Sequence, residues 1–139
     1  MERTQFGGIF FIVIVIIAGV VIYQNQNLQA TIILLIICVI LLLLFYKLTI
    51  TVSEEYVKFS FGIGLIKGKY NFKDIARCQP IKYIPLGWGI RLRPGVILYN
   101  VSGNKAIELE IKNKNRKVWI GTNVPQEIAD YINLLIRKD

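Results

Sequence analysis

The sequence predicts a membrane α-helical hairpin followed by a mainly-β domain that ends in one helix. Three patterns in its 139 residues indicate this architecture. Two long uncharged apolar runs precede Lys47, apolar and polar residues alternate after it, and helical periodicity begins at Pro125. The predicted domains are therefore a two-helix hairpin over residues 1–47 and a β domain over residues 48–139.

The second apolar run, residues 28–46, is the strongest of these signals. From residue 30 to residue 46 it contains no charged side chain. A helix needs about 20 apolar residues, and at least about 17, to cross the hydrocarbon core of a bilayer. A helix on the surface of a soluble protein is apolar on one face only. We therefore predict a transmembrane helix over residues 28–46.

The first apolar run, residues 6–23, follows a short polar start at residues 1–5. Its many β-branched residues would favour a strand in water, but a lone strand in lipid leaves its backbone groups unpaired, so a helix is predicted. A cleaved signal peptide is the alternative, and the absence of an A-x-A cleavage site argues against it. The turn at residues 24–29 is short enough to require an antiparallel hairpin. Small residues near this turn, Ala18, Gly19, Ala30 and Thr31, either allow close helix packing or face lipid.

The distribution of positive charge predicts the orientation of the hairpin. The turn at residues 24–29 has no Lys or Arg, whereas Arg3 precedes the first run and several lysines follow the second. Both termini are therefore expected in the cytoplasm, in a multi-pass protein of the cell membrane. Glu2 and Arg3 cancel each other, so the part from Lys47 onwards carries the whole net charge of +8. For a tethered domain, anionic lipid explains this charge more simply than nucleic acid.

The residues after Lys47 alternate with the period of half-buried strands. Leu48, Ile50 and Val52 alternate with polar residues, and the pattern recurs along the chain between turn signals such as Pro94-Gly95. About seven strands are expected. They lie at residues 48–52, 57–61, 76–81, 90–93, 96–101, 107–111 and 117–121, with a glycine-broken run at 63–71.

A final helix is predicted over residues 125–137. Pro125 suits the first helical position, and Glu127 suits the positive end of the helix dipole. Its apolar stripe comprises Ile128, Tyr131, Ile132, Leu135 and Ile136. This helix is expected to plug a partly open barrel.

Three local strings carry a resemblance to a known family. They are Gly-Trp-Gly-Ile-Arg at 87–91, Tyr-Asn-Val-Ser-Gly at 99–103, and Gly121-Thr122 before the Pro125 helix. With the order of elements, residues 48–138 resemble the bacterial pleckstrin-homology-like (PH-like) domains of small membrane proteins. The resemblance implies two near-orthogonal antiparallel sheets capped by a C-terminal helix, no catalysis, and self-association, because some relatives form ring-like oligomers.

Lys82, Arg91 and Arg93 are the first candidate binding residues. Eukaryotic lipid-binding relatives hold inositol phosphates with a Lys followed by Arg-x-Arg on their first hairpin, whereas here these residues lie in the middle of the domain. Arg91 and Arg93 share one strand face, where they would grip phosphates. The alternative is cross-strand pairing with Glu108 and Glu110.

Two further regions are candidates for contact with anionic lipid or a partner. Trp88 ends an apolar loop at residues 84–89, which either dips into the head groups or folds back onto the barrel. Lys114 and Arg116 belong to a basic turn with Lys112 and Lys117, which either is simply solvated or touches anionic lipid.

Residue content disfavours catalysis. The chain has no histidine, and its two cysteines, Cys38 in an apolar run and Cys78 in the domain, cannot pair. No catalytic residue, metal ligand or cofactor is therefore predicted. The sequence indicates a non-enzymatic integral membrane protein that presents a basic PH-like domain at the cytoplasmic face. Its expected partners are anionic head groups, a protein partner or further copies of itself, and no nucleic acid. The alternative is a small oligomeric channel or transport-accessory subunit.

Overall fold

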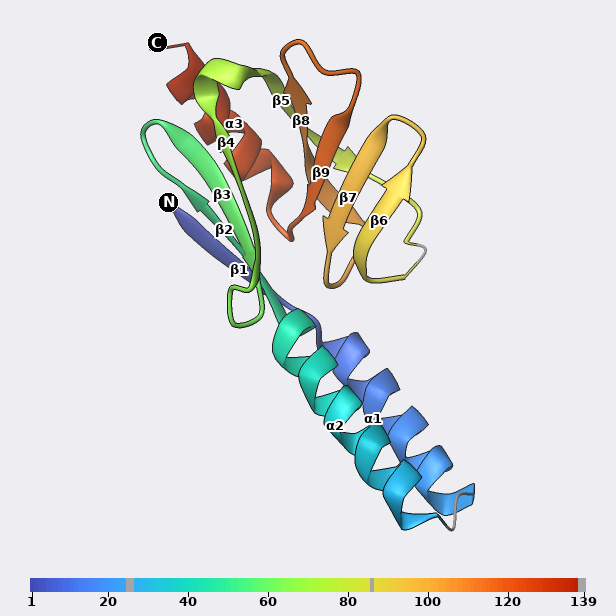
Figure 1. Cartoon of the computed structure of the whole chain (residues 1–139). Coiled ribbons are helices and arrows are strands. Elements are labelled where there is room, and N and C mark those ends of the chain that lie inside the picture. The colour runs from blue at the N-terminus through green and yellow to red at the C-terminus, as the bar shows by residue number, and fades with distance from the viewer. Residues whose placement is uncertain (25–26, 86, 138–139) are drawn as a thin grey trace.

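The computed structural model describes residues 1–24, 27–85 and 87–137, and shows a helical hairpin projecting from one end of a β unit (Figure 1). One strand precedes the hairpin, and the remaining strands and a last helix follow it. The elements are β1 (Glu2–Phe6), α1 (Gly8–Gln24), α2 (Leu28–Phe45), β2 (Lys47–Val52), β3 (Tyr56–Phe61), β4 (Ile66–Asn71), a 3-10 turn (Phe72–Asp74), β5 (Ile75–Lys82), β6 (Gly89–Arg93), β7 (Val96–Asn100), β8 (Lys105–Ile111), β9 (Lys117–Gly121) and α3 (Pro125–Ile136).

The hairpin is inserted between two neighbouring strands of one sheet. β1 pairs antiparallel with β2, in a register that runs from Glu2 opposite Thr51 to Phe6 opposite Lys47. Where the strands pass into the helices, the Gly7 N–H donates to the Tyr46 carbonyl oxygen at 2.8 Å. The polar start expected at residues 1–5 is thus largely a strand of the β unit. A boundary at residue 47 would separate that strand from its own sheet.

Sheet A has the strand order β1-β2-β3-β4. The predicted alternation is confirmed here, because Leu48, Ile50 and Val52 are buried while the threonines between them lie on the outer face. Gly68 of β4 has a packing role, since a Cβ there would lie 2.4 Å from the Phe59 ring. The Phe59 ring in turn lies 4.3 Å from the Tyr99 ring of β7, so the inner face of sheet A packs on the second sheet.

Sheet B has the strand order β5-β8-β9-β7-β6. β7 and β9 run parallel, with Val96 opposite Lys117 and Tyr99 opposite Ile120. The mainly-β form is as predicted, but the details differ: the described residues from Lys47 onwards form eight strands rather than about seven, β1 adds a ninth, and one pair is parallel rather than antiparallel. The parallel pair arises because the chain skips one strand position when it passes from β7 to β8. β9 then returns antiparallel to β8 and fills the skipped position beside β7.

α3 packs against β5 and β8 and completes the core (Figure 1). The predicted helix is confirmed to within one residue, and Ile128, Ala129 and Ile132 are fully buried. Tyr131, predicted in the buried stripe, is instead 37% exposed. The buried side of the predicted hydrophobic stripe thus belongs to the core that the two sheets share.

Asn133 of α3 completes the hydrogen bonding of an edge strand. Its side-chain Nδ2 donates to the Cys78 carbonyl oxygen at 2.8 Å, and its Oδ1 accepts from the Cys78 N–H at 3.3 Å. β5 has a strand neighbour on one side only, so Cys78 would otherwise present both groups unpaired. Burial, with the nearby charges of Asp130 and Glu108, raises the pKa of the Cys78 thiol to about 12. Because Cys78 is only 1% exposed, it packs as a structural residue of the core.

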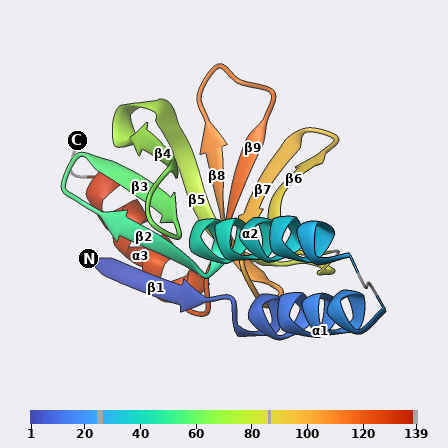
Figure 2. The ribbon, with the colours of Figure 1, turned by 60° about the horizontal axis from the view of Figure 1, so that its bottom comes forward.

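α1 and α2 lie side by side in both ribbon views (Figure 2). Ile14 and Ala18 of α1 are buried, whereas nothing lies within 4 Å of a Cβ placed at Gly19. Of the small residues near the turn, Ala18 therefore packs and Gly19 does not. α2 is long and apolar enough to span a bilayer, the one such helix among the described residues, and α1 contains a shorter apolar helical stretch.

Candidate membrane-facing and anion-binding surfaces

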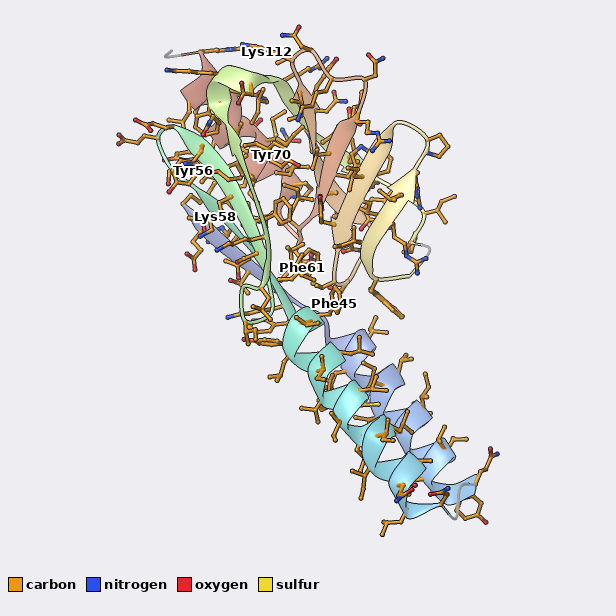
Figure 3. The ribbon with its side chains drawn as sticks, in the orientation of Figure 1. Phe45, Tyr56, Lys58, Phe61, Tyr70 and Lys112 are labelled. Carbon is orange, nitrogen blue, oxygen red and sulfur yellow. The ribbon has the colours of Figure 1, made fainter. Side chains whose placement is uncertain are left out.

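Backbone contacts join the end of α2 firmly to sheet A. The Gly62 N–H donates to the Lys47 carbonyl at 2.8 Å, and the Ile63 N–H donates to the Leu43 carbonyl at 3.2 Å. The last carbonyl groups of a helix have no partner within it, so the β3–β4 turn supplies one from outside. Figure 3 shows Phe45 at the head of the hairpin just below Phe61, and their rings pack edge to face at 5.6 Å. The helix therefore continues into the β unit without a free linker.

The β3–β4 turn, residues 62–65, forms an apolar tip beside this junction. Ile63 is 58% exposed and Leu65 is 72% exposed. No charge lies within the turn, and Lys67 follows it on β4. This surface was not predicted, because the sequence showed only a run broken by glycines at this place.

The predicted site residues do not form one site. Lys82 faces Lys105 across β5 and β8, beside the start of α3. Lys114 and Arg116 lie exposed in the β8–β9 turn, next to Lys112, which Figure 3 places at the end of the β unit opposite the hairpin. They lie at the wrong end of the unit to contact the bilayer that the hairpin would enter.

Arg91 and Arg93 hold a loop rather than a carboxylate. Arg93 donates to the Ile84 carbonyl at 3.0 Å, and its guanidinium lies 5.8 Å from the Trp119 ring centre. The Arg91 side chain lies close to Gly87, where a Cβ would be 2.0 Å from its guanidinium nitrogen. The predicted alternative of pairing with Glu108 and Glu110 is wrong, because none of the ion pairs between described residues joins these groups.

Trp88 lies near the hairpin end of sheet B. It is half-buried, and a Cβ on the following Gly89 would lie 3.5 Å from the Phe45 ring. Ile84 at the start of this loop is 73% exposed, and Leu86 lies outside the described residues. The contact of this loop with lipid stays a prediction.

Glu108 is the buried polar centre of the outer face of sheet B. It accepts hydrogen bonds from Gln79 at 2.6 Å, Lys117 at 2.9 Å and the Trp119 indole at 2.7 Å. Burial alone raises the pKa of Glu108, but the hydrogen bonds from these three side chains and the Lys117 charge outweigh it, so the pKa lies below its ordinary value. All three partners are donors, so the carboxylate is held by hydrogen bonds within the sheet and this cluster stabilises the fold.

Acid should weaken the fold through this carboxylate. A lowered folded-state pKa gives stability that is present above the ordinary pKa of 4.5 and lost as the pH falls through the folded value. Glu108→Gln should lower the free energy of unfolding by about 2 kcal/mol at pH 7, because hydrogen bonds to a charged group are lost. The deficit should shrink as the pH falls below 4.5. Thermal unfolding in detergent at both pH values measures it, with exposed Glu110→Gln as the control expected to change little.

A lysine cluster that the sequence did not single out lies on the outer face of sheet A. Lys58 stands directly opposite Lys69 in the β3–β4 register, and Lys67 occupies the same face one pleat closer to the hairpin. The Lys69 ammonium lies 4.0 Å from the Tyr56 ring centre. With Tyr56 and Gly68, these lysines line a shallow hollow of about 390 Å³. In Figure 3, Tyr56 and Lys58 are seen on sheet A.

Two lysines of this cluster, Lys58 and Lys69, face each other across the β3–β4 pair. Like charges directly opposite each other destabilise a sheet. Across the part of the chain that the structure describes, none of the recorded ion pairs involves Lys58, Lys67 or Lys69. The register of β3 and β4 therefore concentrates positive charge on this face of sheet A. The sequence signal for this cluster is that its lysines occupy positions of β3 and β4 that face the same side. That signal identifies a cluster only once β3 and β4 are known to pair.

Within the described ranges, no three His, Cys, Asp or Glu side chains gather closely enough to hold a metal ion. The fold defines the structural class of the chain: an apolar helical hairpin inserted between two adjacent strands of a basic β unit. No family model, no curated protein and no solved structure matches it.

Proposed function

We propose that this chain is a two-pass membrane protein that holds a basic β unit against the cytoplasmic face and binds anionic groups there without catalysing a reaction. The observation that carries the proposal is the pairing of β1 with β2 around the hairpin. The contacts of the β3–β4 turn with the end of α2 support a fixed rather than a flexible attachment. The resemblance to PH-like domains adds the expectation of self-association.

The pairing of β1 with β2 supports two crossings rather than one. α2 has the length and hydropathy of a spanning helix, but paired strands must lie on the same side of a membrane. If α2 crosses alone, β1 and β2 are separated. α1 must therefore cross in the opposite direction, and its uncharged sequence fits the bilayer core.

The lysine cluster supports the lipid-binding part of the proposal. Lys67 lies one residue, and Lys69 three residues, beyond the Leu48–Phe61–Ile66 row nearest the hairpin. At about 3.3 Å per residue, all three lysines lie within roughly 10 Å of that row. The Debye length at physiological salt is about 8 Å, so an anionic leaflet at that row attracts Lys67 most strongly and Lys58 and Lys69, about 10 Å away, less strongly. Each lysine near such a surface contributes about 1 kcal/mol.

Cysteine labelling in intact cells tests the anchoring. In a Cys38→Ala chain, Gln24→Cys places a thiol at the outer turn and Lys114→Cys places one on the β unit, while Cys78 stays buried. A membrane-impermeant maleimide should label the first in intact cells and the second only after lysis. Labelling of the Lys114→Cys chain from outside would reverse the orientation, and recovery of the protein in the soluble fraction would end the proposal.

Vesicle sedimentation tests the binding surface. The probe is a soluble form in which a short linker joins residue 7 to residue 46. Replacing Lys58, Lys67 and Lys69 together by Gln should weaken binding to vesicles rich in phosphatidylglycerol by up to about 100-fold, from about 1 kcal/mol per lysine. The matched control replaces Lys112, Lys114 and Arg116, which removes the same charge from the far end. Equal losses in the two variants would show that net charge alone attracts the protein.

A further inference from the structure

We propose that the β3–β4 turn enters the membrane interface as a second, shallower anchor beside α2. The inference rests on the proposed function, since it needs α2 to cross a bilayer. It assigns a role to Ile63 and Leu65, which are exposed apolar residues outside the helices. The ligand of this surface is the boundary between the head groups and the acyl chains.

The depth of the turn follows from its contact with α2. An 18-residue helix is about 27 Å long, slightly less than a hydrocarbon core of about 30 Å, so its whole length is needed to span. Leu43 lies two residues before the last residue of α2, within about 3 Å of the helix end. Because the Ile63 N–H donates to the Leu43 carbonyl at 3.2 Å, Ile63 lies at the same depth.

The backbone N–H groups of the turn are suited to the membrane interface. An unpaired N–H is costly where water is scarce. The N–H groups of Gly62, Ile63 and Gly64 all donate within the protein, to Lys47, Leu43 and Phe61 respectively. Immersing the tip therefore leaves none of these three donors without an acceptor.

The side chains of the turn and its flanks match an interfacial position. Ile63 and Leu65 form the apolar tip, and Lys47 and Lys67 lie beside it with long stems that can keep their ammonium groups among the head groups. Ile84 and Leu92 are similarly exposed, but among the described residues no backbone hydrogen bond to α2 comes from the segments around them. The hydrogen bond from the Ile63 N–H to the Leu43 carbonyl distinguishes the β3–β4 turn from these other exposed apolar residues.

A second anchor limits rotation of the β unit about the hairpin axis. The hairpin alone sets the height of the unit above the membrane, whereas a tip embedded to one side of α2 also sets which flank leans towards the lipid. The tip belongs to sheet A, so the lysine cluster on β3 and β4 is the flank brought towards the head groups.

Nitroxide depth measurements test this inference in the full-length chain. Leu65→Cys in the Cys38→Ala background is spin-labelled, reconstituted into phosphatidylcholine–phosphatidylglycerol vesicles, and compared with Leu92→Cys and Lys114→Cys. The Leu65 label should be relaxed several-fold more effectively by oxygen than by a water-soluble nickel chelate. The two controls should show the reverse, and Leu92 is matched because it is 76% exposed.

The outcomes separate this inference from the proposed function. If the protein resists carbonate extraction but the Leu65 label behaves like the Lys114 label, the turn lies in water and only the second anchor is overturned. If carbonate extracts the protein, the membrane anchoring itself fails. Ile63→Cys provides a second position, and a water-exposed label there as well would overturn the inference.

Discussion

Gly62→Ala should detach the β3–β4 turn from α2 and destabilise the intact protein by about 3 kcal/mol or more. Gly62 has φ +48°, a left-handed conformation that costs a residue with a Cβ roughly 1–2 kcal/mol. The new Cβ would also lie 2.0 Å from the Leu43 carbonyl oxygen and 2.5 Å from that of Leu44. Both atoms belong to a helix backbone, so neither can rotate away.

Gly64→Ala separates the two contributions to this effect. Gly64 also has positive φ, at 91°, but nothing lies within 4 Å of a Cβ placed there. This control should therefore show the conformational cost without the clash. Thermal unfolding of both variants in detergent measures the difference. Equal destabilisation would mean that the contact between the turn and α2 contributes nothing, and would also weaken the case for a second anchor.

Removing β1 should be far more damaging than removing the hairpin. A form that joins residue 7 to residue 46 through a short linker should be soluble and folded, because the two ends are hydrogen-bonded neighbours at 2.8 Å. A form that begins at residue 47 loses the whole β1–β2 ladder and exposes the edge of β2. It should aggregate or unfold several degrees to tens of degrees lower. Circular dichroism melting and size-exclusion chromatography compare the two.

The contacts of β1 with the rest of the unit explain the expected difference. Gln5 is buried and its side-chain nitrogen donates to the Ser102 carbonyl and to Asn123, each at 2.9 Å. Arg3 forms an ion pair with Glu127 of α3, and the N-terminal amine donates to the Val52 carbonyl at 2.7 Å. If the form that begins at residue 47 proved as stable as the linked form, β1 would be a dispensable addition to sheet A.

The linked form also allows the binding of the β unit to vesicles to be measured without the membrane anchor. A soluble β unit that binds anionic vesicles through the lysine cluster would show that recognition does not need the hairpin. The hairpin would then supply local concentration and orientation. A small binding module of moderate affinity becomes effective when it is held beside its ligand.

The candidate site was predicted less well than the fold. Arg91 and Arg93 share a strand face, as predicted, but on that face Arg93 donates to the Ile84 carbonyl and Arg91 lies against Gly87. Lys114 and Arg116 were predicted as members of a basic turn, yet that turn lies away from the hairpin. Lys58 and Lys69 are eleven positions apart, and only the β3–β4 register brings them together. Charge along the chain predicts little about charge across a sheet.

The sequence alone determined the apolar hairpin, the alternation of most strands and the amphipathic last helix, because each depends on a local repeat of side-chain character. Only the tertiary structure decided that residues 2–6 form a strand, since Glu-Arg-Thr-Gln-Phe has too few apolar residues to show a period and is held by its partner β2. The tertiary structure also decided the parallel pairing of β7 with β9 and the seating of Gly62 against α2. These features are contacts between distant segments, and their energy appears only after the chain has folded.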